Sequence, residues 1–115
     1  MTDPLRRMIA YIAAVIVEGH FAEGVFDFEI GSRFTVSGSI EGDTVDVTDE
    51  TDGLRLAGEL PRLFQADGTV VTLEIKDDEF TAVEATSGDK LTGRVSGRNI
   101  DLHDAAQGKD YVFCL

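Results

Sequence analysis

The chain of 115 residues has no tryptophan, one cysteine, two prolines and only three lysines. The single cysteine, Cys114, excludes an intramolecular disulfide framework and any zinc site built from several cysteines. The longest uncharged apolar run has ten residues, from Met8 to Val17, which is about half of what a membrane-spanning helix needs. The length is that of one domain, so we expect a single domain over residues 1–115.

Positive charge is also scarce. The chain has 22 acidic and 10 basic side chains, a formal net charge of −12. A salt-rich cytoplasm would favour such acidity, because carboxylates hold water and cations. An acidic protein without salt adaptation is the other interpretation. Nucleic acids and anionic membranes both attract lysine and arginine, which are few here. The sequence therefore predicts a cytoplasmic protein that binds neither nucleic acid nor membrane, and it leaves open whether the acidity is a halophilic adaptation.

Residues 1–19 have the pattern of a helix. Thr2 or Asp3 can cap it, Pro4 suits its first turn, and Gly19 can end it. A secretory signal peptide is the rival interpretation, but no convincing cleavage site follows Val17. Large apolar side chains recur at helical spacing, at Leu5, Met8, Ile9, Ile12, Val15 and Ile16.

Small and apolar residues also occupy the opposite side of this helix, at Ala10, Ala14 and Val17. One face of a sheet covers only one side of a helix, so the other side would stay in water at a free-energy cost. We therefore expect a second chain to cover it, most simply in a two-fold homodimer in which Ala10 and Ala14 allow close approach. A helix that plugs a barrel of its own chain is the alternative.

Residues 24–115 have the two-residue period of antiparallel strands. Phe26, Phe28 and Ile30 alternate with acidic residues, and a loop over 31–33 would place Phe28 opposite Val36. An Asp67-Gly68 turn would place Phe64 opposite Val71. About nine short strands with turn signals between them predict a mainly β fold, an antiparallel β-sandwich or a small up-and-down barrel, with one N-terminal α-helix.

One hairpin occurs twice, at 36–49 and at 91–104, and the two copies align without a gap at an offset of 55 residues. Each copy is followed four residues later by a glycine, and chance convergence of glycine-rich hairpins is the alternative to a true repeat. Glycine at the first central position of a two-residue turn supplies the positive φ that such turns require. The predicted turns are Gly42-Asp43 and Gly97-Arg98, which pair Gly38 with Val47 and Gly93 with Leu102.

Few residues suggest chemistry. Asp101 and His103 share one face of a strand, where an aspartate could orient an imidazole for general-base work or metal binding. A solvated histidine is the plainer interpretation. The acidic cluster of Asp46, Asp49, Glu50 and Asp52 lacks a calcium loop, so we interpret it as a solvated turn. Cys114, one residue from the end, is a poor nucleophile position. We assign no catalytic, cofactor-binding or metal-binding residue and expect no cofactor.

These observations favour a non-enzymatic acidic β-domain that acts as a protein-interaction or self-assembly module. The first alternative is a barrel that binds an apolar small molecule in its interior. The second is a small hydrolase or isomerase that uses His103 with Asp101.

Overall fold

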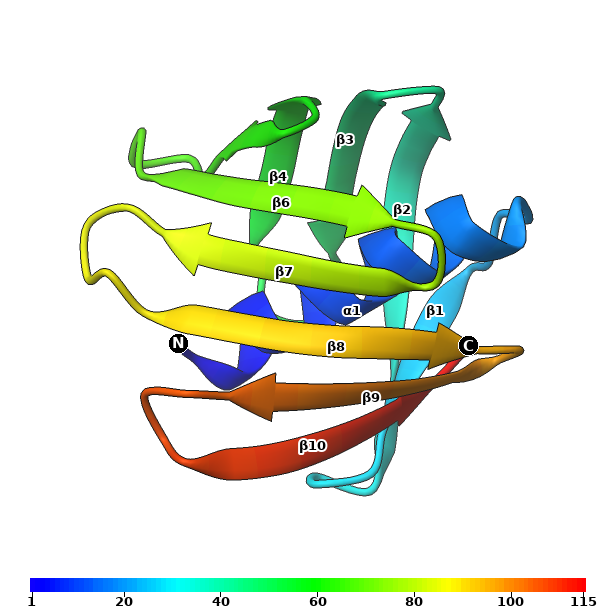
Figure 1. The fold of residues 1–115 in the computed structure, drawn as a ribbon. Helices are drawn as coiled ribbons and strands as arrows, with labels where there is room; N and C mark the ends of the chain where they lie inside the picture. Colours follow the sequence, from blue (N-terminus) through cyan, green and yellow to red (C-terminus); the bar gives the residue numbers. More distant parts are fainter.

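Ten antiparallel strands surround one helix in the computed structural model, which describes all 115 residues (Figure 1). The helix is α1 (Asp3–Glu18), and the strands follow without another helix. They are β1 (Gly24–Asp27), β2 (Ser32–Glu41), β3 (Thr44–Asp49), β4 (Arg55–Glu59), β5 (Arg62–Phe64), β6 (Val70–Lys76), β7 (Glu79–Glu84), β8 (Lys90–Ser96), β9 (Asn99–Asp104) and β10 (Lys109–Cys114).

The strands form a closed up-and-down barrel. Each strand pairs with the next in the sequence, and β1 also pairs with β10 through Phe26 opposite Cys114 and Asp27 opposite Phe113. This pairing closes the sheet, so the sandwich alternative does not apply. The mainly β prediction with one N-terminal helix is confirmed, with ten strands where about nine were expected.

Local signals define both ends of α1. The Thr2 hydroxyl accepts a hydrogen bond from the Leu5 N–H at 3.4 Å, and Pro4 lies in the first turn. Gly19 adopts a φ of 72° and donates its N–H to the Val15 carbonyl, which ends the helix as predicted. No helix in the structure combines the length and the apolar character needed to cross a membrane.

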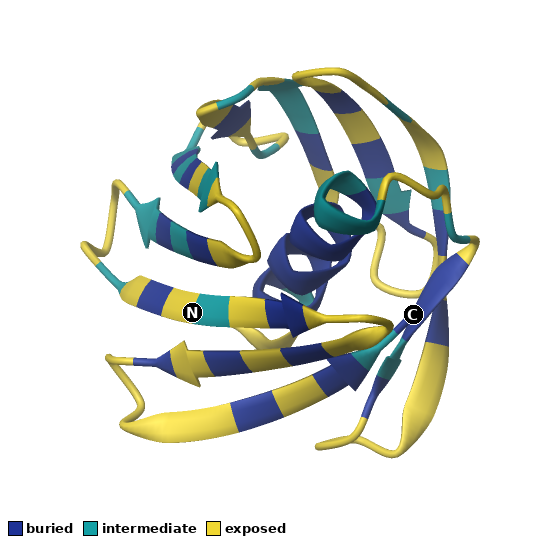
Figure 2. Cartoon of the chain, turned by 45° about the vertical axis from the view of Figure 1, so that its right-hand side comes forward, coloured by how far each residue is buried: buried dark blue, intermediate teal, exposed yellow.

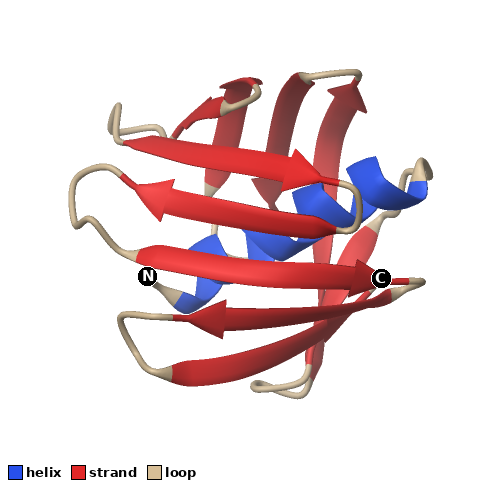
Figure 3. Ribbon diagram, in the orientation of Figure 1, coloured by secondary structure: helices blue, strands red, loops and turns tan.

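The barrel encloses α1 within its own chain. Every residue from Leu5 to Val15 is buried, so no side of this part of the helix faces water. Figure 2 shows the helix inside the ring of strands, whose buried and exposed residues alternate, and Figure 3 shows the same arrangement by element type. The expectation that a sheet covers only one side of the helix is therefore wrong, because a closed sheet covers all sides.

This burial also removes the predicted dimer contact. Ala10 and Ala14 are completely buried inside the barrel and cannot meet a helix of a second chain. A homodimer remains a prediction, but its interface has to lie on another surface.

The two predicted turns are confirmed at one end of the barrel. Gly42 and Gly97 have φ values of 59° and 61°, and each opens a two-residue connection. The predicted register also holds, since Gly38 pairs with Val47 and Gly93 pairs with Leu102. Gly93 leaves room on the inner side for the ring of Phe80, which a β-carbon at position 93 would meet at 2.2 Å.

The predicted pairings of Phe28 and Phe64 are wrong. Strand β1 ends at Asp27, whose side chain is buried, so the buried residue opposite Phe34 is Val25 and Phe28 lies in an exposed turn. The loop after β5 is longer than two residues, because Gln65 donates its N–H to the Thr69 carbonyl. Phe64 therefore pairs with Val70 and faces outward, while the buried Leu63 pairs with Val71.

Candidate functional site

Three aspartates end strands at the same rim of the barrel. Asp27, Asp49 and Asp104 each precede a glycine of positive φ by four residues, at Gly31, Gly53 and Gly108. In each turn, the Oδ1 atom accepts backbone N–H groups two and three residues further on, at 2.9–3.4 Å. This leaves the Oδ2 atom of each aspartate free to point into the barrel.

Arginines of α1 bind these three Oδ2 atoms. Arg7 donates to Asp27 at 3.1 Å and to Asp49 at 3.0 Å, and Arg6 donates to Asp104 at 3.0 Å. All five side chains are nearly or completely buried. The guanidinium of Arg7 also lies 3.5 Å from the centroid of the Phe34 ring, and the guanidinium of Arg6 lies 4.1 Å from that of Tyr111.

The electrostatics of this network follow from its hydrogen bonds. Burial alone would raise the pKa of Asp104. Hydrogen bonds from the Gln107 N–H and from Arg6, together with nearby positive charge, outweigh burial and lower that pKa below its usual range. No buried side-chain nitrogen or oxygen lacks a partner. Every buried polar side-chain atom of the network is therefore bonded within the protein, and the network ties α1 to the rim of the barrel.

One member of the acidic cluster, Asp49, departs from the solvated turn that we predicted. Asp49 is completely buried because its carboxylate holds both its own turn and Arg7. The other members agree with the prediction in being exposed, although Asp52 also pairs with Arg7 at 2.5 Å. They are Asp46, Glu50 and Asp52. A hydrogen bond from Arg55 lowers the pKa of Asp46 on the outer face. No cluster of side chains in the structure could hold a metal ion.

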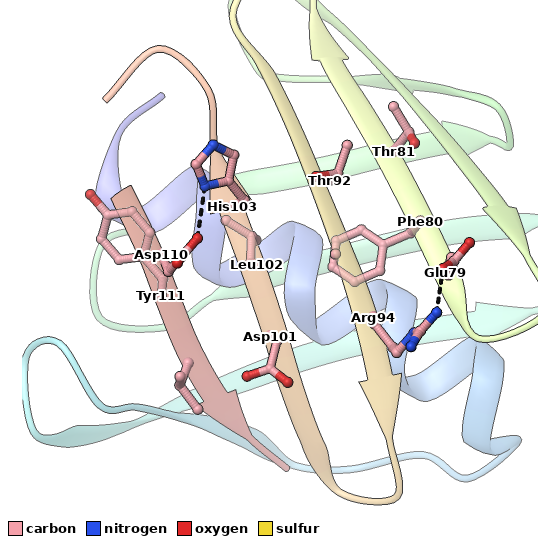
Figure 4. A pocket seen from close by; sticks show the side chains of 12 residues that line it. Glu79, Phe80, Thr81, Thr92, Arg94, Asp101, Leu102, His103, Asp110 and Tyr111 are labelled. Carbon is pink, nitrogen blue, oxygen red and sulfur yellow. Dashed lines mark hydrogen bonds and ion pairs between the residues drawn. The ribbon is translucent and has the colours of Figure 1, made fainter. Parts of the chain in front are cut away.

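The outer face of β7–β10 carries a shallow groove of about 600 Å³ (Figure 4). Adjacent strands place two rows of side chains across it. One row runs Thr81, Thr92, His103, Asp110. The second row runs Glu79, Arg94, Asp101, Val112.

His103 has a different partner from the one expected. Asp101 and His103 do share the outer face of β9, but His103 Nδ1 lies 2.7 Å from Asp110 Oδ1 on β10. Figure 4 shows this contact, with Asp101 further along the strand. The His103 side chain is 51% exposed and that of Asp110 is 84% exposed. The pair of His103 and Asp110 therefore lies in water. Sequence analysis did not predict it, because Asp110 comes from the neighbouring strand.

The side of the groove at β10 continues into an apolar surface, which we call the seam patch because it covers the pairing of β1 with β10. It consists of Phe26, Phe28, Ile30 and Val112. Phe28, Ile30 and Val112 are 55%, 47% and 41% exposed, respectively. The rings of Phe26 and Phe28 meet edge to face with centroids 4.8 Å apart, and the Phe28 N–H donates to the Val112 carbonyl at 3.2 Å.

Charged residues of both signs lie beside the seam patch. Lys109 of β10 forms an ion pair with Glu29, which lies between Phe28 and Ile30 in the turn. The hydrogen bond to Glu29 raises the pKa of Lys109. Cys114 lies half-buried at the end of β10, where its thiol contacts only the Leu115 carbonyl among polar groups.

The sequence carries signals for the buried network. Two adjacent arginines in an otherwise apolar helix need acidic partners when they are buried, and an aspartate four residues before a glycine marks candidate partners, a spacing found at Asp27, Asp49 and Asp104. Comparisons of the chain with protein-family models, curated proteins and solved structures found no match.

Proposed function

We propose that this chain is a non-enzymatic protein-interaction or self-assembly module that makes its contacts through the outer face of the barrel. The observation that carries the proposal is the seam patch, in which three large apolar side chains of β10 and of the turn after β1 are exposed on a protein of net charge −12. Exposed apolar surface of this kind is typical of a protein interface.

The arrangement of the barrel supports an external site. An apolar ligand in the interior would need the space that α1 occupies, and α1 is held there by apolar packing and two buried arginines. The alternative of a ligand-binding barrel is therefore less favoured than a surface interaction.

The pair of His103 and Asp110 supports an enzyme less strongly than the seam patch supports an interaction module. His103 and Asp110 are both largely in water, so no desolvation strengthens their interaction with a substrate. The one arginine that lines the groove, Arg94, already pairs with Glu79 and Asp78. We further propose a cytoplasmic location, since the one cysteine is a free thiol and the acidic surface suits a salt-rich cytoplasm.

Sedimentation and native mass spectrometry of the full chain test the proposed function. Potassium chloride is varied from about 0.1 M to about 3 M, because net charge opposes association at low salt. We expect a mass that rises with protein concentration and no bound small molecule. A chain that is monomeric at every salt concentration and carries an apolar molecule at one equivalent would contradict the proposal.

A further inference from the structure

We propose that the seam patch is the contact between two copies of this chain, related by a two-fold axis. This inference rests on the proposed function and identifies the partner. It also replaces the interface through α1, whose apolar side chains are covered by the barrel.

The patch is held rigidly in its exposed position. Asp27 Oδ1 accepts the N–H groups of Glu29 and Ile30, while its Oδ2 binds the buried Arg7. The Phe28 N–H is bound to β10. The exposed side chains of Phe28 and Ile30 therefore project from a fixed backbone, and ordering that backbone costs no further entropy on binding.

Charge beside the patch favours a second copy over a partner of one sign. Glu29 and Lys109 pair with each other on this small surface within one chain, with side chains 40% and 49% exposed. A two-fold contact repeats every interaction on both sides of the axis, so the two copies can exchange this pair, with Glu29 of each copy facing Lys109 of the other. A strongly basic partner would be repelled by Lys109, and a strongly acidic partner would be repelled by Glu29.

The patch is small, which determines the strength of the dimer. The surface area of three exposed apolar side chains is well below the area of about 1,600 Å² that a standard interface buries. The whole-molecule charge of −12 also repels a second copy until salt screens it. The inference therefore predicts a weak dimer that forms at high protein concentration and is favoured by salt.

A matched pair of variants tests the location of the contact. Phe28→Ser removes the most exposed ring of the patch, and Phe64→Ser removes a 45% exposed ring on β5. We expect Phe28→Ser to raise the dimer dissociation constant about tenfold or more, as truncating an aromatic anchor does, and Phe64→Ser to leave it unchanged. Sedimentation gives the constants, and circular dichroism checks that both variants fold. Equal effects of the two variants would overturn the location.

A charge-exchange experiment tests the two-fold pairing. Glu29→Lys and Lys109→Glu are each expected to dimerise more weakly than the natural chain, because each brings like charges together across the axis. Mixing the two variants should restore dimerisation, since the mixed pair again faces Lys with Glu on both sides. The mixing experiment is run at the lowest salt concentration at which the natural chain dimerises. No recovery on mixing would show that the ion pair acts only within one chain and would overturn the two-fold arrangement.

The outcomes separate this inference from the proposed function. Self-association that survives Phe28→Ser, or association only with another protein, overturns the seam contact between copies and leaves the interaction role in place. A natural chain that stays monomeric at about 1 mM in high salt overturns the inference. If that monomer also carries a bound small molecule, both are overturned.

Discussion

The Arg7 guanidinium and the Asp49 carboxylate are both completely buried, and they meet at 3.0 Å inside the barrel. Asp49 is the last residue of β3 and Arg7 belongs to the helix, so this contact fixes α1 against the rim of the sheet. Asp27 binds the same guanidinium, and it also shapes the turn that exposes Phe28. The buried network and the seam patch are therefore parts of one structural arrangement.

Arg7→Met should lower the free energy of unfolding by about 3–5 kcal/mol, because it leaves the Asp27 and Asp49 carboxylates buried without a cationic partner. Arg55→Met is the control, since Arg55 pairs with Asp46 in water, with both side chains more than half exposed. Loss of that exposed pair should change the free energy by less than about 1 kcal/mol. Urea unfolding measures both values, and similar losses would show that the buried contact has no special weight.

Acid should destabilise the protein partly through Asp104. Its pKa is lowered in the folded state from an ordinary value of 3.8, so in acid the unfolded chain binds a proton more readily. The contribution of Asp104 is complete above the unfolded-state pKa and is lost as the pH falls through the folded-state pKa. Asp104→Asn should make unfolding free energy less dependent on pH below about 4. Urea unfolding at several pH values measures this dependence. If the unfolding free energy of Asp104→Asn falls with pH as steeply as that of the natural chain, the assignment is contradicted.

Two glycines of the first hairpin copy should differ in their tolerance of a side chain. Gly42 has a φ of 59° and open space around it, so Gly42→Ala should cost about 1 kcal/mol of stability from backbone strain alone. Gly38 has a φ of 114°, and an added β-carbon would lie 2.0 Å from the Asp46 carbonyl oxygen. Gly38→Ala should therefore cost clearly more. The reverse order in thermal or urea unfolding would contradict the register of β2 and β3.

Salt should stabilise the fold if the acidity is an adaptation to a salt-rich cytoplasm. Between about 0.1 M and 1 M salt the screening length falls from roughly 10 Å to 3 Å, which weakens repulsion among surface carboxylates. We expect the melting temperature to rise steeply over this range in potassium chloride. Comparison with sulfate separates screening from salting-out effects on apolar burial. A melting temperature that does not change with potassium chloride would rule out the halophilic interpretation.

The parts of the fold that the sequence predicts well are those set by local geometry. The ends of α1 follow from Thr2, Pro4 and Gly19, and the two-residue turns follow from Gly42 and Gly97. In each case one residue has a conformational or hydrogen-bonding property that decides the structure within a few positions. Alternation of apolar residues then gives the register of the strands beside each turn.

Prediction failed where a distant partner decides the outcome. Asp27 faces inward with Val25 because Arg7 is there to bind it, so Phe28 lies on the outer face and not on the predicted inner one. The closure of β1 on β10 and the position of α1 inside the barrel also depend on contacts across the whole chain. For the groove, the partner of His103 is Asp110 on the next strand, and a pattern within one strand cannot show it.

Hydrogen exchange of the backbone amides in α1 tests the central claim, that the chain fills its barrel with its own helix and works from the outer face. The account predicts that amides in the fully buried part of α1, from Met8 to Ala14, exchange as slowly as those of the central barrel strands. Both would then open only when the whole protein unfolds. If α1 exchanges much faster than β8 and β9 under native conditions, the helix leaves the barrel without global unfolding, and the interior is open to a ligand.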